Sequence, residues 1–141
     1  MRNAAFFLTP KSELVFLKRD ATVRQGTEKL ENHPFLEIIV IDDEGKLTGI
    51  LSTKDLLIAY RHIEGLSFET AHQFKIKDIF KEGNLRTVYI DTPEDDLVAI
   101  GAKQNIIPVV DSVNTFMGIV RRADLLQQYY QEMRQLKDGR D

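Results

Sequence analysis

The sequence predicts an α/β (α+β) fold made of two tandem β-α-β-β-α units that are related by a pseudo-twofold axis. Two observations lead to this prediction. The chain of 141 residues contains an internal repeat, and each copy alternates short apolar runs with helix-like patterns. A hydrophobic content of 43% supports one ordinary domain or two small units that share a core. We expect the two units to dock through their sheets, which leaves two equivalent clefts.

The repeat is clearest where an apolar strand is followed by a turn, a second strand and a helix start. Segments 38–42 and 49–57 recur as segments 107–111 and 118–126, always 69 positions later. Both copies show an apolar strand that ends in Asp, then Gly and an apolar strand, then an Asp that opens a helix. This order predicts the same supersecondary unit twice.

Upstream of this block the repeat changes register. Phe16 corresponds to Tyr89 at an offset of 73, so the second copy is four residues shorter in the interval that follows. A loss of four residues is close to one α-helical turn of about 3.6 residues. The deletion therefore predicts that the second copy has a helix shortened by one turn.

The predicted elements follow from apolar spacing and turn residues. We expect helices over 22–32, 53–62 and 123–137, strands over 37–41 and 47–51, and turns over 42–46 and 111–115. We place the first unit at 1–65, a connector at 66–76, the second unit at 77–137 and a disordered tail at 138–141.

The last predicted helix carries a broad apolar stripe. One interpretation is packing against the sheet of its own unit, and the other is that its distal part forms a subunit interface. The distal residues concerned are Tyr130, Met133 and Leu136.

Composition excludes several classes of function. The net charge of −3 and the absence of a basic patch with aromatics argue against nucleic-acid binding. No cysteine is present, which excludes disulfides, thiolate catalysis and cysteine zinc sites. We expect no signal peptide and no membrane span, and hence a soluble cytoplasmic protein. His33, His62 and His72 lack metal-ligand spacing, and no catalytic motif is present, so we expect no metal, no cofactor and no enzyme activity.

The repeated motifs resemble the CBS-domain family. Segment 49–55 (GILSTKD) resembles the Gly-apolar-x-Ser/Thr-x-x-Asp nucleotide motif of CBS domains, and 107–111 (IPVVD) resembles their Pro-Val-Val-Asp strand. Segment 7–13 (FLTPKSE) resembles the start of stand-alone CBS-pair proteins of Gram-positive bacteria. The resemblance implies a Bateman module, usually a homodimer, that binds AMP, ATP, S-adenosylmethionine or cyclic di-AMP in clefts built from both copies.

The resemblance implies a first cleft around the Ser/Thr and Asp of copy one. Ser52 and Asp55 would meet phosphate and ribose, Lys54 would add charge, and residues of the second copy would contact the base. These are Thr87, Val88, Asn105, Ile106 and Ile107. The alternative role for Ser52 and Asp55 is to cap the following helix, and the two roles are compatible.

The second cleft departs from the family pattern. Asp124 is present, but Arg121 replaces the Ser/Thr. We hypothesise that Glu37 pairs with Arg121 and obstructs the cleft, because an unpaired buried charge is costly. The rival hypothesis is that Arg121 and Arg122 bind phosphate. The remaining residues expected to face this cleft are Val15, Phe16, Phe35 and Leu36.

The function that these observations favour is a regulatory module that binds an adenine nucleotide and signals to a partner protein. The alternative is a ligand-independent module for dimerisation and protein interaction. The intact Ser52 and Asp55 pair favours the first, whereas Arg121 and Glu37 favour the second.

Overall fold

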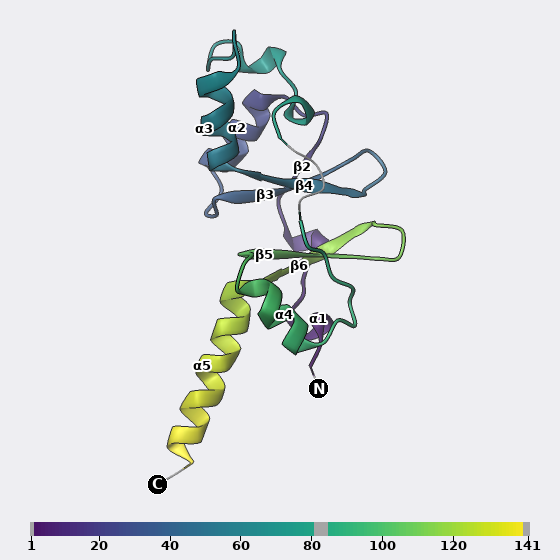
Figure 1. The fold of residues 1–141 in the computed structure, drawn as a ribbon, viewed down its shortest axis with the longest axis vertical. Coiled ribbons are helices and arrows are strands. Elements are labelled where there is room, and N and C mark those ends of the chain that lie inside the picture. Colours follow the sequence, from purple (N-terminus) through teal and green to yellow (C-terminus); the bar gives the residue numbers. More distant parts are fainter. Residues whose placement is uncertain (1, 81–84, 140–141) are drawn as a thin grey trace. The chain divides into compact units, whose positions relative to one another are not determined.

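The computed structural model describes residues 2–80 and 85–139 and divides the chain into two compact units. The first unit is Val15–Leu85, and the second unit combines Met1–Leu14 with Arg86–Asp141. Each unit contains one three-stranded sheet with helices packed on it (Figure 1). The predicted mixed α and β fold with two related units is confirmed.

The first unit has the sheet order β2-β3-β4, with β2 parallel and β4 antiparallel to β3. Thr22 caps the first of its α-helices: its Oγ1 accepts from Gln25 N at 3.1 Å, and the Gln25 side chain accepts from Thr22 N at 2.9 Å. Such a capping box fixes a helix start. The elements are β2 (Phe16–Lys18), α2 (Val23–Glu31), β3 (Glu37–Ile41), β4 (Leu47–Ser52), α3 (Thr53–His62), η2 (Ala71–Gln73) and η3 (Ile76–Asp78).

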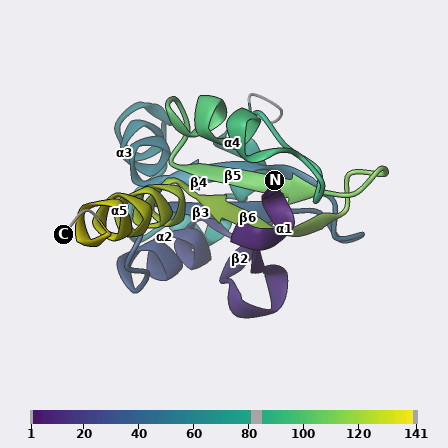
Figure 2. The same ribbon diagram turned by 90° about the horizontal axis from the view of Figure 1, so that it is seen from below.

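The second unit has the sheet order β1-β6-β5, with both pairings antiparallel. Its last helix runs past the end of the other helices of the unit (Figures 1 and 2). The elements are α1 (Ala4–Phe7), β1 (Thr9–Pro10), η1 (Lys11–Glu13), α4 (Glu94–Gly101), β5 (Ile106–Val110), β6 (Phe116–Arg121) and α5 (Arg122–Asp138).

The two hairpins use the same turn chemistry with different residues. Asp42 Oδ1 accepts from the backbone N–H groups of Glu44 and Lys46, each at 2.9 Å, and Asp111 Oδ1 accepts equivalent bonds at 3.0 and 2.8 Å. The turn position with positive φ is Gly45 in the first unit and Asn114 in the second. Asn is among the few residues besides Gly that tolerate this conformation, which explains the substitution.

Each unit buries its own apolar cluster between helices and sheet. In the first unit Val23 and Leu56 pack against Val40 and Leu51, and all four are buried. In the second unit Leu97 and Leu125 pack with Ile107 and Val120 in the same way. The repeat thus encodes two related cores.

The expected alignment of Phe16 with Tyr89 is wrong. Leu17 pairs with Val40 and Val88 pairs with Val109, so the true offset at the first strand is 71. Helix α4 has eight residues and α2 nine, so no whole turn has been lost. A slip of two residues preserves the in-and-out alternation of a strand, so apolar patterning alone cannot detect it.

The unit boundaries also differ from those predicted. The expected connector 66–76 belongs to the first unit, where Leu66, Ala71 and Ile76 are buried and Ile76 N donates to Ala21 O at 2.9 Å. Residues 1–14 pack with the second unit, since β1 pairs with β6. Of the expected tail, Asp138 ends α5 and Gly139 caps it, whereas residues 140 and 141 lie outside the described residues.

The N-terminal segment is held by an ion-pair cluster within the second unit. Arg2 makes a bidentate pair with Glu94, at 2.9 and 3.1 Å, and also pairs with Glu132 of α5. The hydrogen bond from Arg2 holds the pKa of the Glu132 carboxyl below its ordinary value. Arg2 therefore connects the start of the chain to α4 and α5.

Substitution of Gly118 by Ala should destabilise the protein by about 1–3 kcal/mol. An added Cβ would overlap the Thr9 carbonyl oxygen and lie 2.8 Å from Leu8 Cδ1, so β1 would be forced away from β6. Urea denaturation measures the change. Gly139→Ala, at a negative φ on the exposed end of α5, is the control and should change little. Equal stability of the wild type and Gly118→Ala would contradict the close approach.

Substitution of Arg2 by Gln should lower the Tm at neutral pH, and the difference should shrink as the pH falls below about 4. The depressed pKa of Glu132 means that its pairing stabilises the fold above its unfolded-state pKa and is lost as it protonates. Thermal melts at a series of pH values provide the test. Lys103→Gln removes the same charge from an exposed site and serves as control. A Tm difference that is constant with pH would argue against the ion pair.

Candidate functional site: a pocket in the first unit

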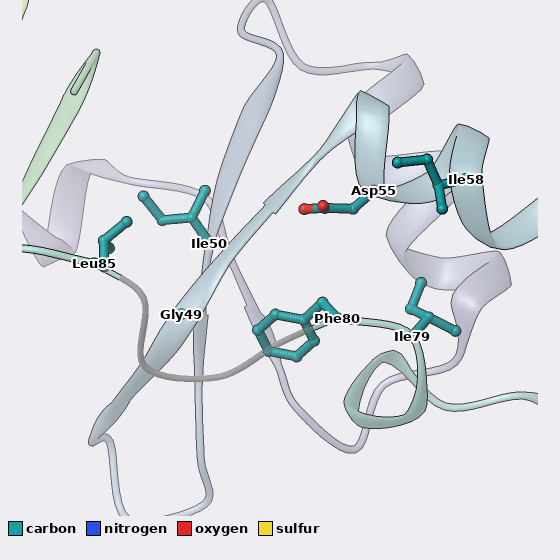
Figure 3. Close-up of a pocket in the computed structure, with 7 residues that line it drawn as sticks. All are labelled: Gly49, Ile50, Asp55, Ile58, Ile79, Phe80 and Leu85. Atoms are coloured by element: carbon teal, nitrogen blue, oxygen red, sulfur yellow. The ribbon is translucent and has the colours of Figure 1, made fainter. Parts of the chain in front are cut away.

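A pocket of about 510 Å³ lies within the first unit, beside β4 and the start of α3 (Figure 3). This volume falls within the usual range of small-molecule sites, roughly 300–1,000 Å³. Seven described residues line it: Gly49, Ile50, Asp55, Ile58, Ile79, Phe80 and Leu85.

Most of the lining is apolar, and Asp55 is the one ionisable side chain among these seven residues. In Figure 3 the Asp55 carboxylate points from the start of α3 into the space next to Ile50 and Ile58, while the Phe80 ring lies along another wall. A flat apolar group fits between such walls, and the carboxylate accepts hydrogen bonds from a polar part of the same ligand.

The position of Asp55 is fixed by a reciprocal capping box. Ser52 Oγ accepts from Asp55 N at 3.1 Å, and Asp55 Oδ2 accepts from Ser52 N at 2.8 Å. The Oδ1 atom takes part in neither bond. The capping interpretation of these two residues is therefore confirmed, and it leaves one carboxylate oxygen for a ligand.

The equivalent motif of the second unit is arranged differently. Arg121 occupies the N-cap position without a side-chain capping bond, and its Nε donates to Asp124 Oδ2 at 3.2 Å. The neighbouring Arg122 donates through Nε to the carbonyl of Gly101, at 2.6 Å, near the end of α4. Thus Asp124 Oδ2 accepts a hydrogen bond from an arginine side chain, whereas Asp55 Oδ2, at the same position of the repeat, accepts one from a backbone N–H.

The structure distributes the predicted site residues over both units. The first unit contains Val15, Phe16, Phe35, Leu36, Glu37, Ser52, Lys54 and Asp55. The second contains Thr87, Val88, Asn105, Ile106, Ile107, Arg121, Arg122 and Asp124. Both predicted clefts combine residues from the two units, so they stay predictions, as does the pairing of Glu37 with Arg121.

Within the units these residues differ in what they offer a ligand. Lys54 is exposed on the first turn of α3, and Thr87 and Asn105 are exposed as well. Val88 and Ile107 are buried in the core of the second unit. A ligand would therefore reach the side chains of the first group but only the backbone of the second.

Sequence reasoning found Asp55 but missed the other lining residues. Ile58 follows Asp55 by three positions, so helical spacing places both on one face, and Ile50 lies inside the repeated motif. These two could have been inferred. Ile79, Phe80 and Leu85 lie far from Asp55 along the chain, so no local spacing in the sequence connects them with the pocket.

Comparison with known proteins defines the class. Residues 7–62 match the family model of the CBS domain, and the chain has the fold of a CBS pair. Residues 7–62 thus match a CBS domain, and the structures that share the fold of the chain are those of stand-alone CBS proteins of Gram-positive bacteria, in agreement with the predicted resemblance.

Two solved structures illustrate the likeness. The CbpB protein of Listeria monocytogenes, in complex with c-di-AMP, is 21% identical, has a TM-score of 0.82, and is matched over 93% of this chain and 97% of that chain. The CBSX2 protein, in complex with AMP, is 25% identical, has a TM-score of 0.76, and is matched over 94% and 99%.

A curated relative is much longer. The inosine-5′-monophosphate dehydrogenase of Helicobacter pylori is 25% identical over 113 residues, which are 79% of this chain and 21% of that enzyme. The chain thus spans about a fifth of the length of this relative.

In residues 2–80 and 85–139, no helix combines the length and apolar character that crossing a bilayer requires.

Substitution of Ser52 by Ala should destabilise the protein by about 1 kcal/mol, because the N–H of Asp55 loses its acceptor. Equilibrium unfolding in urea measures this change. Thr53→Ala, one position along and exposed, is the matched control and should have little effect. If the two variants unfold alike, the capping box does not stabilise α3.

Proposed function

We propose that this CBS pair is a regulatory module that binds an adenine nucleotide at the pocket of the first unit. The observation that carries the proposal is the position of Asp55, the one carboxylate among the described residues that line a largely apolar pocket of about 510 Å³. Structures of CbpB with c-di-AMP and of CBSX2 with AMP support the choice of ligand class.

The chemistry of the pocket fits a nucleoside. The Asp55 carboxylate accepts hydrogen bonds from the ribose hydroxyls, because an ionised carboxylate is an acceptor only. The Ile50 and Ile58 side chains and the Phe80 ring cover the faces of the base. The N-terminus of α3, capped by Ser52, provides backbone N–H groups and a favourable dipole for a phosphate.

The proposed role is binding rather than catalysis. General acid–base chemistry needs a second positioned group, and Asp55 is the one ionisable side chain among the described lining residues. The proposal includes a cytoplasmic setting, a homodimer and a protein partner, as the family resemblance implies.

A regulatory mechanism follows from which segments form the walls. Asp55 and Ile58 come from α3, whereas Ile79, Phe80 and Leu85 belong to the segment that leads along the chain to Arg86 and the second unit. A ligand that contacts both walls would hold Ile79, Phe80 and Leu85 in this position against α3. Because coupling between two sites is reciprocal, a partner that prefers the same position would strengthen nucleotide binding.

The second candidate function is a ligand-independent interaction module. The Arg121–Asp124 ion pair favours it, since the carboxylate that would meet a ribose in the second motif already accepts from an arginine. This candidate predicts that no adenine nucleotide binds at either motif.

Calorimetric titration with AMP, ATP and cyclic di-AMP in turn tests the proposal. One of them should bind saturably, and Asp55→Asn should weaken it at least about tenfold, because a hydrogen bond to a charged group contributes about 1.5–3 kcal/mol.

Asp124→Asn changes the same motif position in the other copy and is the matched control, with affinity expected within about twofold of wild type. Loss of binding in Asp124→Asn with full binding in Asp55→Asn would move the site to the second unit. No binding by any of the three nucleotides would leave the interaction module as the function.

A further inference from the structure

The second unit exposes three large apolar side chains that lie close together. They are Phe6, Tyr89 and Ile90, with exposed fractions of 57%, 56% and 40%, and we call them the apolar patch. Ile90 O accepts from Ala5 N at 2.9 Å, which places the exposed side of α1 beside the turn that contains Tyr89 and Ile90. Figure 1 shows α1 beside the start of α4, which follows this turn.

Hydrogen bonds and buried contacts fix the backbone around the apolar patch. Thr92 N donates to Tyr89 O at 3.1 Å, and Thr92 Oγ1 accepts from Tyr89 N at 3.0 Å. On the other side Ala4 and Phe7 anchor α1, since both are buried. A surface whose backbone is already ordered loses little conformational freedom when a partner binds.

The first unit repeats this backbone arrangement. Three bonds of the second unit have counterparts in the first: Thr92 N to Tyr89 O matches Ala21 N to Lys18 O, Ala5 N to Ile90 O matches Lys77 N to Arg19 O, and Ala4 N to Thr92 O matches Ile76 N to Ala21 O. The positions of the apolar patch in the second unit are therefore equivalent to those of Lys18, Arg19 and Asp78 in the first.

The fold does not require apolar side chains at these positions. The first unit forms the same backbone bonds with Lys18, Arg19 and Asp78, all three of them charged. Exposed aromatic side chains that the scaffold does not need, gathered in one place, are typical of an interaction site.

Acidic side chains follow the apolar patch directly in the sequence. Asp91, Asp95 and Asp96 are all exposed. Asp95 and Asp96 lie in the first turn of α4, where negative charge also stabilises the helix. Asp91 precedes the helix, so the helix dipole does not account for it.

The first unit neutralises the counterpart of Asp91, and the second unit has lost the means to do so. Asp20 stands at the equivalent position and pairs with Lys77 at 3.1 Å. Ala5 takes the place of Lys77 in the second unit, so Asp91 has no equivalent of this ion pair.

The arginine beside the apolar patch is already paired. Arg2 Cζ lies 5.5 Å from the centroid of the Phe6 ring, and both Glu94 and Glu132 pair with the Arg2 guanidinium. The charge that this surface offers a partner is therefore negative.

Charge complementarity decides between the possible occupants. Negative charge repels nucleic acid, an anionic membrane and the same surface of a second copy, whereas it attracts lysine and arginine. The aromatic and aliphatic side chains of the patch need apolar groups to cover them. The occupant that fits both is a protein segment in which basic and apolar side chains are combined.

We propose that the apolar patch, with the carboxylates of Asp91, Asp95 and Asp96, is a docking surface for a basic and apolar segment of a partner protein. This inference rests on the proposed function only for the existence of a protein partner. Nucleotide binding plays no part in it.

An NMR titration of the full chain tests the surface directly. The probe is a short synthetic peptide of leucine and lysine in an amphipathic helical pattern, and a leucine–glutamate peptide of the same length and pattern is the control. The Leu–Lys peptide should bind saturably, with the largest shifts at the backbone amides of residues 5–6 and 89–91. The Leu–Glu peptide should bind at least about tenfold more weakly.

Tyr89→Lys tests the apolar part of the surface, because it introduces the residue that the first unit has at this position. It should weaken the Leu–Lys peptide at least about tenfold, since an aromatic anchor is replaced by a like charge. Val113→Lys adds the same charge at another exposed apolar position of the second unit and should stay within about twofold of wild type. Circular dichroism melts should show that both variants are folded.

The double variant Asp91→Lys with Asp95→Lys tests the charged part. It should reverse the preference, so that the Leu–Glu peptide binds more tightly than the Leu–Lys peptide.

Four results would overturn the inference: no saturable binding of the Leu–Lys peptide, shifts confined to other residues, undiminished binding by Tyr89→Lys, or a double variant that still prefers the Leu–Lys peptide. Nucleotide affinity of Tyr89→Lys, measured in parallel, separates this inference from the proposed function. Loss of the peptide with retained nucleotide binding is the expected result for this variant. Peptide binding by a wild type that binds no nucleotide would contradict only the proposed function.

Discussion

The reciprocal hydrogen bonds between Ser52 and Asp55 are the constraint on which the candidate site depends. They hold the carboxylate at the start of α3 by one oxygen, through a backbone N–H that cannot move away independently of β4. A free aspartate side chain would sample several rotamers and would lose that freedom on binding. Because the helix cap has already restricted it, this carboxylate, the one charged side chain among the described lining residues, is in place before a ligand binds.

The second unit shows how the same scaffold loses this arrangement through one residue. Corresponding backbone bonds are kept, since Thr53 N donates to Leu36 O and Arg122 N donates to Asn105 O, each at 3.0 Å. Both hairpins also carry a register shift at the same place in the repeat. At the cap the side chain differs: Arg121 has no hydroxyl to accept the helix N–H, and its guanidinium donates to the carboxylate of Asp124 instead. The two hairpins thus share these backbone bonds and differ in the side-chain chemistry at the cap.

Sequence reasoning succeeded where local rules decide the structure. Strand Glu37–Ile41 and helix Thr53–His62 have the predicted bounds. The strand is an almost continuous apolar run, and the helix begins after the capping residue Ser52, so the local sequence marks both elements. It failed where distance along the chain is large. The two-residue slip at Val88 and the burial of Ile76 depend on tertiary pairing that no local pattern records. For the same reason Asp55 could be named from its motif, whereas Phe80 could not.

The assignment of residues 1–14 to the second unit has a consequence for how the chain folds. The first unit is continuous, so its contacts can form once residue 85 has left the ribosome. Strand β1 must wait for β6, since Thr9 pairs with Ile119, more than a hundred residues later. Contacts of such long sequence separation form late and slow the folding of a domain. Residues 1–14 leave the ribosome before the rest of the second unit and are therefore among the last of its residues to reach their native partners.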